Sequence, residues 1–384
     1  MNIRPRTLRD GRTVWRCEFS LGRDLATGKP RRVVETCEGT RREAERFWVR
    51  RLAELRSQQD AFLRPSKEPL ADYLARWLDG RRRDLRPTTW TSYEVMVRRY
   101  LTPVLGGTRL RDLAPAAVQR MLDALAEEGQ VSARTVAYVR TVLRIALQDA
   151  VRLGTLAANP VDRTRPPKQT PRRVDAFTPE ELAALFRAAD GTRVANLLPF
   201  LAYSGLRRGE ALALRWEDVD FAAATVSVRR SRVSAGGRVY DQEPKTEAGV
   251  RTVTLPAQAL DALRRQREMR AADMRAALAR GWRYRNGGWV FATRTGKPLE
   301  PSRVSRDFRR VRDAAGVRAL PLHALRHTAV SLQIAAGVPL EIISKRIGHR
   351  QVGITADRYG HLLPQADREA AAKLSAYLAR RETP

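Results

Sequence analysis

The sequence predicts a multidomain, mainly α-helical protein. It combines a small N-terminal α+β module, a four-helix domain, and a mostly helical C-terminal domain with a small antiparallel sheet. The length of 384 residues implies two or three domains, because one domain takes roughly 150 residues. Apolar residues recur at helical spacing over most of the chain, and alternating strand patterns occur in two short regions. A basic, proline-rich stretch separates the two helical parts.

The N-terminal module spans residues 1–62. Alternating residues in "TVWRCEFSLG" and "PRRVVETCEG", with the turn-forming "DLATGKP" between them, predict a β-hairpin. The segment "TRREAERFWVRRLAEL" then predicts a helix capped by Thr40, since Ala44, Phe47, Trp48 and Leu52 share one face. We therefore expect a small sheet packed on one helix.

Residues 66–160 contain four amphipathic segments. Their apolar faces begin at Leu70, Tyr93, Val118 and Val136, and Ser132 is a suitable cap for the last helix. This pattern predicts a four-helix domain. Four prolines among basic residues in "NPVDRTRPPKQTPRRVD" then indicate an extended linker, which we place at residues 161–174.

A new domain begins at residue 175 and extends to residue 384. Thr178, Pro179 and Glu181 form a capping box with proline at the first helical position. Helical patterns continue to Trp216. The segments "ATVSVRR", "RVYDQEP" and "VRTVTL" predict three short strands, and helices dominate again from Pro256 apart from "GWVFAT".

The charge of the chain indicates a polyanionic partner. There are 72 Lys and Arg residues against 42 Asp and Glu, a formal net charge of +30. Nucleic acid is the commonest such partner, and acidic membrane or ribosome surfaces are the alternatives. Two cysteines, Cys17 and Cys37, support neither a disulfide framework nor a thiolate metal site. No apolar run of about 18 residues predicts a membrane span, so we expect a cytoplasmic protein.

Three segments contain candidate site residues. In "LAYSGLRRGEALALRW", Arg207 opens a helix after a turn, which suits a phosphate. In "PLHALRHTAV", His323 and Arg326 share a helical face, and we expect His327 to point elsewhere. In "RIGHRQVGITADRYGH", a short loop is expected between His349 and Tyr359. Each residue taken singly also has an ordinary structural role, such as a packing tyrosine.

Together these segments resemble the tyrosine recombinases, or phage integrases. That family combines an arginine in a "SGLRxGE" helix start, a lysine on a β-hairpin, an "HxLRH" box and a "GHxxxxxTxxxY" box. The matching catalytic positions are Arg207, Lys245 in "EPKTEAGVRTVTL", His323, Arg326, His349 and Tyr359. The resemblance implies an arm-site-binding module at residues 1–62, a core-binding domain at 66–160 and a catalytic domain at 175–384.

The resemblance also implies the chemistry. Tyr359 would attack a DNA phosphate and form a covalent 3'-phosphotyrosine intermediate, with His323 as the preferred acceptor of its proton because a phenol of pKa about 10 is a poor nucleophile. Arg207 and Arg326 would hold the phosphate oxygens with help from His349, and Lys245 would protonate the leaving 5' oxygen. Glu210 would support Arg207.

The expected function is site-specific recombination for integration and excision of a mobile element. The expected partners are double-stranded DNA at core and arm sites, a homotetramer on DNA, a host DNA-bending protein and an excisionase. No cofactor, metal or membrane is expected, and the protein would associate with the nucleoid. The alternatives are a type IB topoisomerase-like enzyme and a catalytically silent DNA-binding protein.

Two further expectations concern the ends of the chain. Arg12, Arg16, Arg31 and Arg32 flank the N-terminal strands and would contact arm-site DNA. In the tail, Ala371, Leu374 and Leu378 share a helical face alongside Tyr377. The resemblance implies that this face docks on a neighbouring protomer.

Overall fold

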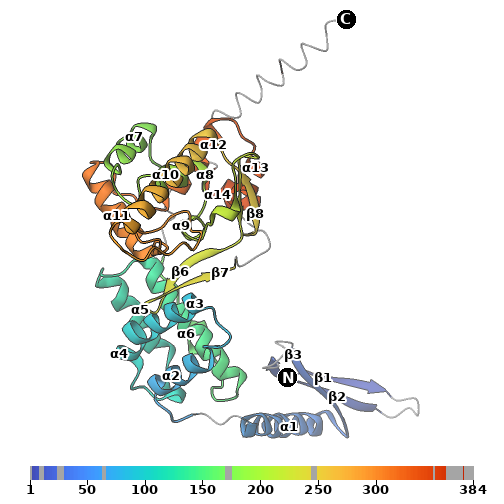
Figure 1. The fold of residues 1–384 in the computed structure, drawn as a ribbon. Helices are drawn as coiled ribbons and strands as arrows, with labels where there is room; N and C mark the ends of the chain where they lie inside the picture. Colours follow the sequence, from blue (N-terminus) through green and yellow to red (C-terminus); the bar gives the residue numbers. More distant parts are fainter. Residues whose placement is uncertain are drawn as a thin grey trace, which may run out of the picture. The chain divides into compact units, whose positions relative to one another are not determined.

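The computed structural model describes residues 2–7, 13–23, 30–62, 66–168, 175–243, 249–348, 351–359 and residue 375. It divides into two compact units, Met1–Thr170 and Pro171–Pro384 (Figure 1). Helices dominate and the sheets are small and antiparallel, so the predicted fold class is confirmed. Within the described residues no helix has the length and apolar character needed to cross a bilayer. Arg12 and the tail residues Ala371, Leu374, Tyr377 and Leu378 fall outside the described residues.

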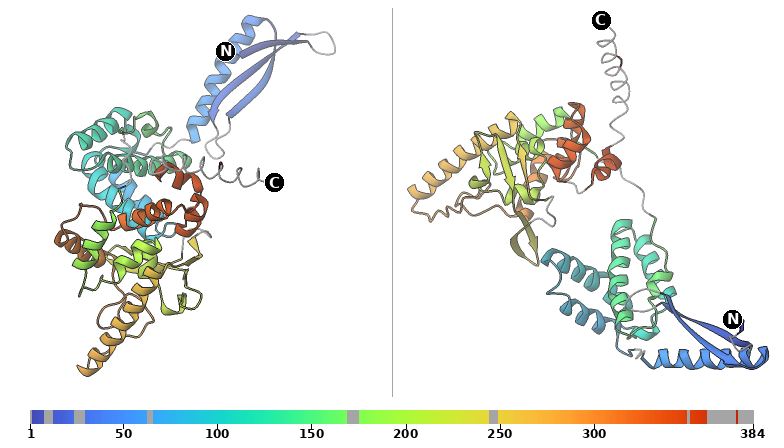
Figure 2. Two further views of the ribbon diagram at one scale, coloured as in Figure 1. Left: turned by 90° about the horizontal axis from the view of Figure 1, so that it is seen from above. Right: turned by 90° about the vertical axis from the view of Figure 1, so that its right-hand side faces the viewer.

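The N-terminal module is a three-stranded antiparallel sheet with one helix packed on it (Figure 2). Its elements are β1 (Asn2–Thr7), β2 (Thr13–Arg23), β3 (Pro30–Glu38) and α1 (Arg41–Phe62). The predicted β2–β3 hairpin and helix are confirmed, and β1 was not predicted. Thr40 and Glu43 form the capping contacts of α1. Phe19 stacks on Trp48 at 5.8 Å and closes the small core.

The helical domain contains the four predicted amphipathic segments. They form α2 (Leu70–Gly80), α3 (Pro87–Met96), which continues through a π-helical turn at Val97–Leu101 into α4 (Thr102–Leu105), then α5 (Pro115–Glu127) and α6 (Ala133–Arg152). Ser132 caps α6, as predicted. The hydroxyl of Tyr73 donates to the carbonyl of Ala146 at 2.6 Å, so a buried polar group on α2 is satisfied by α6.

The first residues of the predicted linker after α6 are folded rather than extended. Pro160–Arg163 forms a 3-10 helix, and Val161 is fully buried. Arg140 of α6 donates to the carbonyls of Val161 and Thr164, both at 3.0 Å. Pro160 therefore does not prevent this first part from packing, because Arg140 of α6 supplies donors for its carbonyls.

The second unit is mainly helical around two small sheets. Its helices are α7 (Pro179–Ala188), α8 (Leu197–Ser204), α9 (Arg208–Leu212), α10 (Ala257–Ala279), α11 (Pro301–Ala314), α12 (Ala324–Ala335), α13 (Leu340–Ile347) and α14 (Val352–Tyr359). Its strands are β4 (Val219–Asp220), β5 (Thr225–Val228), β6 (Ser231–Ala235), β7 (Arg238–Gln242) and β8 (Arg251–Thr254). The sheets are β4-β5-β8 and the hairpin β6-β7. "GWVFAT" forms isolated bridges rather than a strand.

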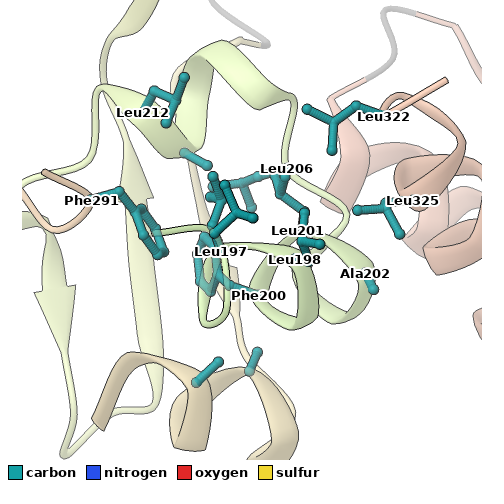
Figure 3. Close-up of a cluster of buried hydrophobic side chains, with 14 of the residues drawn as sticks. Leu197, Leu198, Phe200, Leu201, Ala202, Leu206, Leu212, Phe291, Leu322 and Leu325 are labelled. Carbon is teal, nitrogen blue, oxygen red and sulfur yellow. The ribbon is translucent and has the colours of Figure 1, made fainter. Parts of the chain in front are cut away.

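Helix α8 is the centre of the hydrophobic core in this unit. All but one of its residues are buried, and α10 and α12 pack against it. Figure 3 shows Leu197 and Phe200 directed toward Phe291, with Leu322 and Leu325 on the other side of the helix. The Phe200 and Phe291 rings lie 5.5 Å apart. Helix α8 ends where the candidate site begins.

Candidate active site

Arg207 lies in the turn that joins α8 to α9. Gly205 ends α8 in the left-handed conformation with φ 69°, which a residue without a Cβ adopts readily. Arg207 then precedes the first residue of α9, as the sequence predicts. Its Nη1 donates to Glu210 Oε1 at 2.8 Å and its Nη2 to the carbonyl of Gly348 at 3.0 Å. The guanidinium is therefore fixed from two sides.

Glu210 is the buried anion of the site. Its side chain is 5% exposed and is paired with Arg207 and Arg251. Burial alone raises the pKa of this carboxyl, but the hydrogen bond and charge of Arg251 and the charge of Arg207 outweigh burial and hold the pKa below its usual value. The expected support of Arg207 by Glu210 is confirmed.

His323 and Arg326 come from the start of α12. His323 is the residue that precedes the helix, and Arg326 lies in its first turn. Arg326 is 4% exposed and donates to the carbonyls of Gly205 and Ile347. Burial, followed by the nearby charge of Arg207, lowers the pKa of Arg326 to about 9. A cation held this way, among neutral dipoles, attracts an anion strongly.

Arg207, His323 and Arg326 meet at one cavity of about 420 Å³. Arg208, Ser231, Arg232 and Ser305 also contribute to its walls. The "SGLR" turn and the "HxLRH" box therefore converge, as the sequence predicts, although they are more than 100 residues apart. A cavity with this many guanidinium groups suits a phosphate.

Tyr359 is the last residue of α14 and is 2% exposed. Its ring packs with Val330, Ile343 and Ile347. Among the described residues, neither Tyr359 nor His327 lines the cavity. A short loop was expected between His349 and Tyr359. This prediction is wrong for residues 352–359, which form the helix α14.

His327 contacts the tyrosine. Its Nδ1 lies within hydrogen-bond distance of the Tyr359 hydroxyl, and its ring packs edge-on against that of His323 with centroids 4.8 Å apart. The expectation that His327 points elsewhere is wrong. Residues four apart on a helix lie on one face, so the spacing from His323 to His327 was the available signal. The assignment of His323 as proton acceptor stays a prediction.

Lys245 and His349 lie outside the described residues. The described chain stops at Glu243 after β7 and resumes at Gly249 before β8, and it stops again at Gly348 after α13. Lys245 therefore lies in the chain between β7 and β8, and His349 lies in the chain directly after α13. Within the described residues no group of three His, Cys, Asp or Glu side chains is arranged to hold a metal ion.

Arg251 is a site residue that the sequence analysis missed. It begins β8 and pairs with Glu210 through two hydrogen bonds of 2.9 and 3.2 Å. Arg251 and Glu210 are 41 residues apart, so no local sequence pattern predicts that they pair.

Comparisons with known proteins agree with this geometry. The model of the "Phage integrase family" matches residues 175–366, and that of the "Phage integrase, N-terminal SAM-like domain" matches residues 70–126. The chain is 30% identical over 364 residues to an integrase of Streptomyces ambofaciens, covering 91% of this chain and 89% of that protein. It is 28% identical over 388 residues to a tyrosine recombinase XerC-like protein of Caldanaerobacter subterraneus subsp. tengcongensis, covering 96% and 97%.

Solved structures share the fold. An integrase of transposon Tn1549 in complex with transposon right end DNA has a TM-score of 0.67 at 18% identity, covering 80% of this chain and 99% of that one. A lambda integrase dimer bound to a core site has a TM-score of 0.60 at 19% identity, covering 92% and 93%. With the family model matched over half of the chain, and the cavity built from the family's motif residues, this protein is a member of the phage integrase family of tyrosine recombinases.

Proposed function

We propose that this recombinase cuts and rejoins double-stranded DNA through a 3'-phosphotyrosine bond on Tyr359, in the integration and excision of a mobile element. The observation that carries the proposal is the cavity where Arg207, His323 and Arg326 meet, with the Tyr359 hydroxyl held nearby on His327. The names of the relatives, which include "Putative prophage phiRv2 integrase" and the ICEBs1 integrase of Bacillus subtilis, support the mobile-element role.

The chemistry follows from these groups. The Tyr359 oxygen attacks phosphorus and the bond from phosphorus to the 5' oxygen breaks, so one phosphodiester replaces another. We assign the hydroxyl proton to His327 Nδ1 in place of His323, because His327 Nδ1 lies within hydrogen-bond distance of the Tyr359 hydroxyl. His323 then faces the phosphate from the cavity wall. Lys245 is proposed to protonate the departing 5' oxygen, and His349 to donate to the phosphate.

Arg207 and Arg326 stabilise the charge of the transition state. Removing one such preorganised donor costs about 3 to 4 kcal/mol of transition-state stabilisation. Because both guanidinium groups are already fixed by carbonyls and Glu210, little reorganisation is needed when the phosphate arrives. Rejoining to a different 5' hydroxyl reverses the same steps and needs no nucleotide.

The domain roles and partners are part of the proposal. Residues 1–62 are assigned to arm-site DNA, 66–160 to core-site DNA, 161–174 to the linker and 175–384 to catalysis. A lambda integrase tetramer has been solved on a Holliday junction, which supports a homotetramer here. A host DNA-bending protein and an excisionase are the proposed accessory partners, and the bacterial nucleoid is the proposed location.

A plasmid assay tests the function. The substrate carries two copies of the junction sequence that flanks this gene in its host DNA, and the control plasmid carries none. We expect exchange of the flanking segments on the first plasmid alone. Relaxation of both plasmids without exchange would instead indicate a topoisomerase, and DNA binding without either reaction would indicate a silent DNA-binding protein.

A further inference from the structure

The C-terminal end of α13 is held by three arginines from three different parts of the unit. The last carbonyls of a helix lack partners within the helix and carry the negative end of its dipole, so cations are favourable there. Each of three consecutive carbonyls accepts from a different guanidinium: Arg346 from Arg251 at 2.8 Å, Ile347 from Arg326, and Gly348 from Arg207 at 3.0 Å. The cavity residues Arg207 and Arg326 are therefore bonded directly to the C-terminal end of α13.

Arg251 differs from the other two arginines. Arg207 and Arg326 line the cavity, whereas Arg251 is absent from its described walls and its side chain is 8% exposed. One edge of its guanidinium meets the carboxylate of Glu210, and its Nη1 also donates to the carbonyl of Gly249 at 3.3 Å. A single buried cation thus joins α9, the chain that leads into β8, and the end of α13, which packs beside β8 (Figure 1).

Gly348 shows how closely this contact determines the path of the chain. It adopts φ 69°, and a Cβ placed on it would lie 3.0 Å from Nη1 of Arg251 and 3.1 Å from Cζ. A side chain there would displace the guanidinium. The backbone therefore leaves α13 against the face of Arg251, and the next residue along it is His349, followed by the helix that ends at Tyr359.

We propose that Arg251 is a positioning residue for DNA cleavage. It couples the acidic partner of Arg207 to the end of α13, and so sets the geometry between the phosphate-binding arginines and α14, which ends at Tyr359. The proposal rests on the proposed role of Tyr359 as nucleophile. Misplacement of reacting groups by about 1 Å is enough to slow an enzymatic step about 10²-fold.

The competing explanation is a buried ion pair that only stabilises the fold. Removing one partner of such a pair destabilises a protein wherever the pair lies. The same unit contains a matched control, because Arg193 forms two bonds of 3.0 and 2.6 Å to Asp273 with side chains 18% and 12% exposed. Among the described residues, neither Arg193 nor Asp273 lines the cavity where Arg207, His323 and Arg326 meet.

The test compares Arg251→Lys with Arg193→Lys in the full chain. Lysine keeps the charge but lacks the planar fork that spans Glu210 and the Arg346 carbonyl at once. Covalent adduct formation on saturating nicked core-site duplex is measured in single turnover, DNA affinity by titration, and Tm by calorimetry. We expect Arg251→Lys to cleave about 10²-fold more slowly with affinity within about threefold of wild type, and Arg193→Lys to cleave at the wild-type rate.

A second variant covers the case in which Arg251→Lys does not fold. Glu210→Gln keeps the shape of the side chain and severs the same link, so it should slow cleavage as well, and the double variant should be no slower than the slower single variant. Wild-type cleavage by folded Arg251→Lys, or rate losses that follow Tm in both lysine variants, would overturn the inference. A wild-type chain that forms no adduct would instead overturn the role of Tyr359.

Discussion

At the residue scale, the arginines of the site act both as structure and as ligands. Arg207 and Arg326 line the cavity, yet each also donates to backbone carbonyls at helix ends. Burial holds the pKa of Arg326 near 9, which means that its charged form is disfavoured by its surroundings. A bound phosphate supplies a negative charge that the carbonyl dipoles do not supply. It therefore stabilises the charged form of Arg326, and the binding energy is gained at the reacting phosphate.

His327 gives the first prediction. Replacing it with phenylalanine keeps an aromatic ring on α12 but removes the Nδ1 that contacts the Tyr359 hydroxyl. We expect adduct formation to fall at least about 10²-fold, because general base catalysis contributes that much, while DNA affinity is unchanged. Single-turnover cleavage on a nicked site measures the rate.

Ser331→Ala is the control for this prediction. Ser331 lies one turn further along α12, and its hydroxyl donates to the carbonyl of His327 at 3.1 Å rather than to the imidazole ring. Its cleavage rate should match wild type. Unimpaired cleavage by His327→Phe would show that the proton goes elsewhere, with His323 as the next residue to test.

The site residues that belong to recognisable sequence motifs could be predicted from the sequence. Local patterns place Arg207, His323 and Arg326 at a helix start or in a first turn, and the resemblance to the tyrosine recombinases implies that they share one site. Arg251 could not be predicted, since its partner Glu210 is brought to it by the tertiary fold. His327 had a usable signal in its i, i+4 spacing from His323, and the mistake was to compare it only with its neighbour Arg326.

At the element scale, the capping box of α7 connects two distant parts of the catalytic unit. Glu181 accepts from the backbone of Thr178 at 2.8 Å and from Nε of Arg318 at 2.7 Å. The hydrogen bond from Arg318 is the largest cause that lowers the pKa of Glu181 to about 2, against a smaller opposing effect of burial. The start of α7 is thereby attached to the segment that precedes α12.

The second prediction concerns acid stability. A carboxyl whose pKa is lowered on folding stabilises the protein above its unfolded pKa near 4.5, and this contribution disappears as pH falls toward 2. Glu181→Gln should therefore destabilise the catalytic unit by about 1 kcal/mol at pH 7, the usual scale of a helix cap, and by less at pH 3. Urea unfolding at the two pH values checks this. An equal loss at both would contradict the role of the charge.

The elements that the sequence did not predict lack a clear apolar pattern of their own. β6 is the polar segment "SRVSA", and it pairs with β7 across Gly236 and Gly237. α14 has eight residues, too few for a stable isolated helix, and it is completed when Tyr359 packs against residues of α12 and α13. The long amphipathic helices, by contrast, bury continuous apolar faces that the sequence shows directly.

At the scale of the whole molecule, the net charge of +30 favours a polyanionic partner, and the N-terminal sheet carries part of this positive charge. Arg4 and Arg16 are exposed and directly opposite each other on β1 and β2. Like charges in such a cross-strand pair are unfavourable in the free protein. A DNA phosphate between them would reverse that cost, which supports a second DNA site for this module.

The third prediction follows from this pair. In footprinting of the full chain across DNA that flanks the crossover region, we expect discrete protection outside the core site at moderate salt. The double variant Arg4→Ala and Arg16→Ala should lose this protection and still cleave an isolated core site. Uniform protection that fades equally on all sequences as salt rises would mean that the module only adds non-specific affinity.

The most direct test of the mechanism is the identity of the nucleophile. Full-length protein is incubated with a nicked duplex of the core site, and the products are separated on a denaturing gel, with the attached peptide identified by mass spectrometry. We predict an adduct on Tyr359 in the wild type, and no adduct from Tyr359→Phe, which retains the ring and the basic cavity and should bind the same DNA. An adduct formed by Tyr359→Phe, or one attached to a different residue of the wild-type chain, would contradict the mechanism.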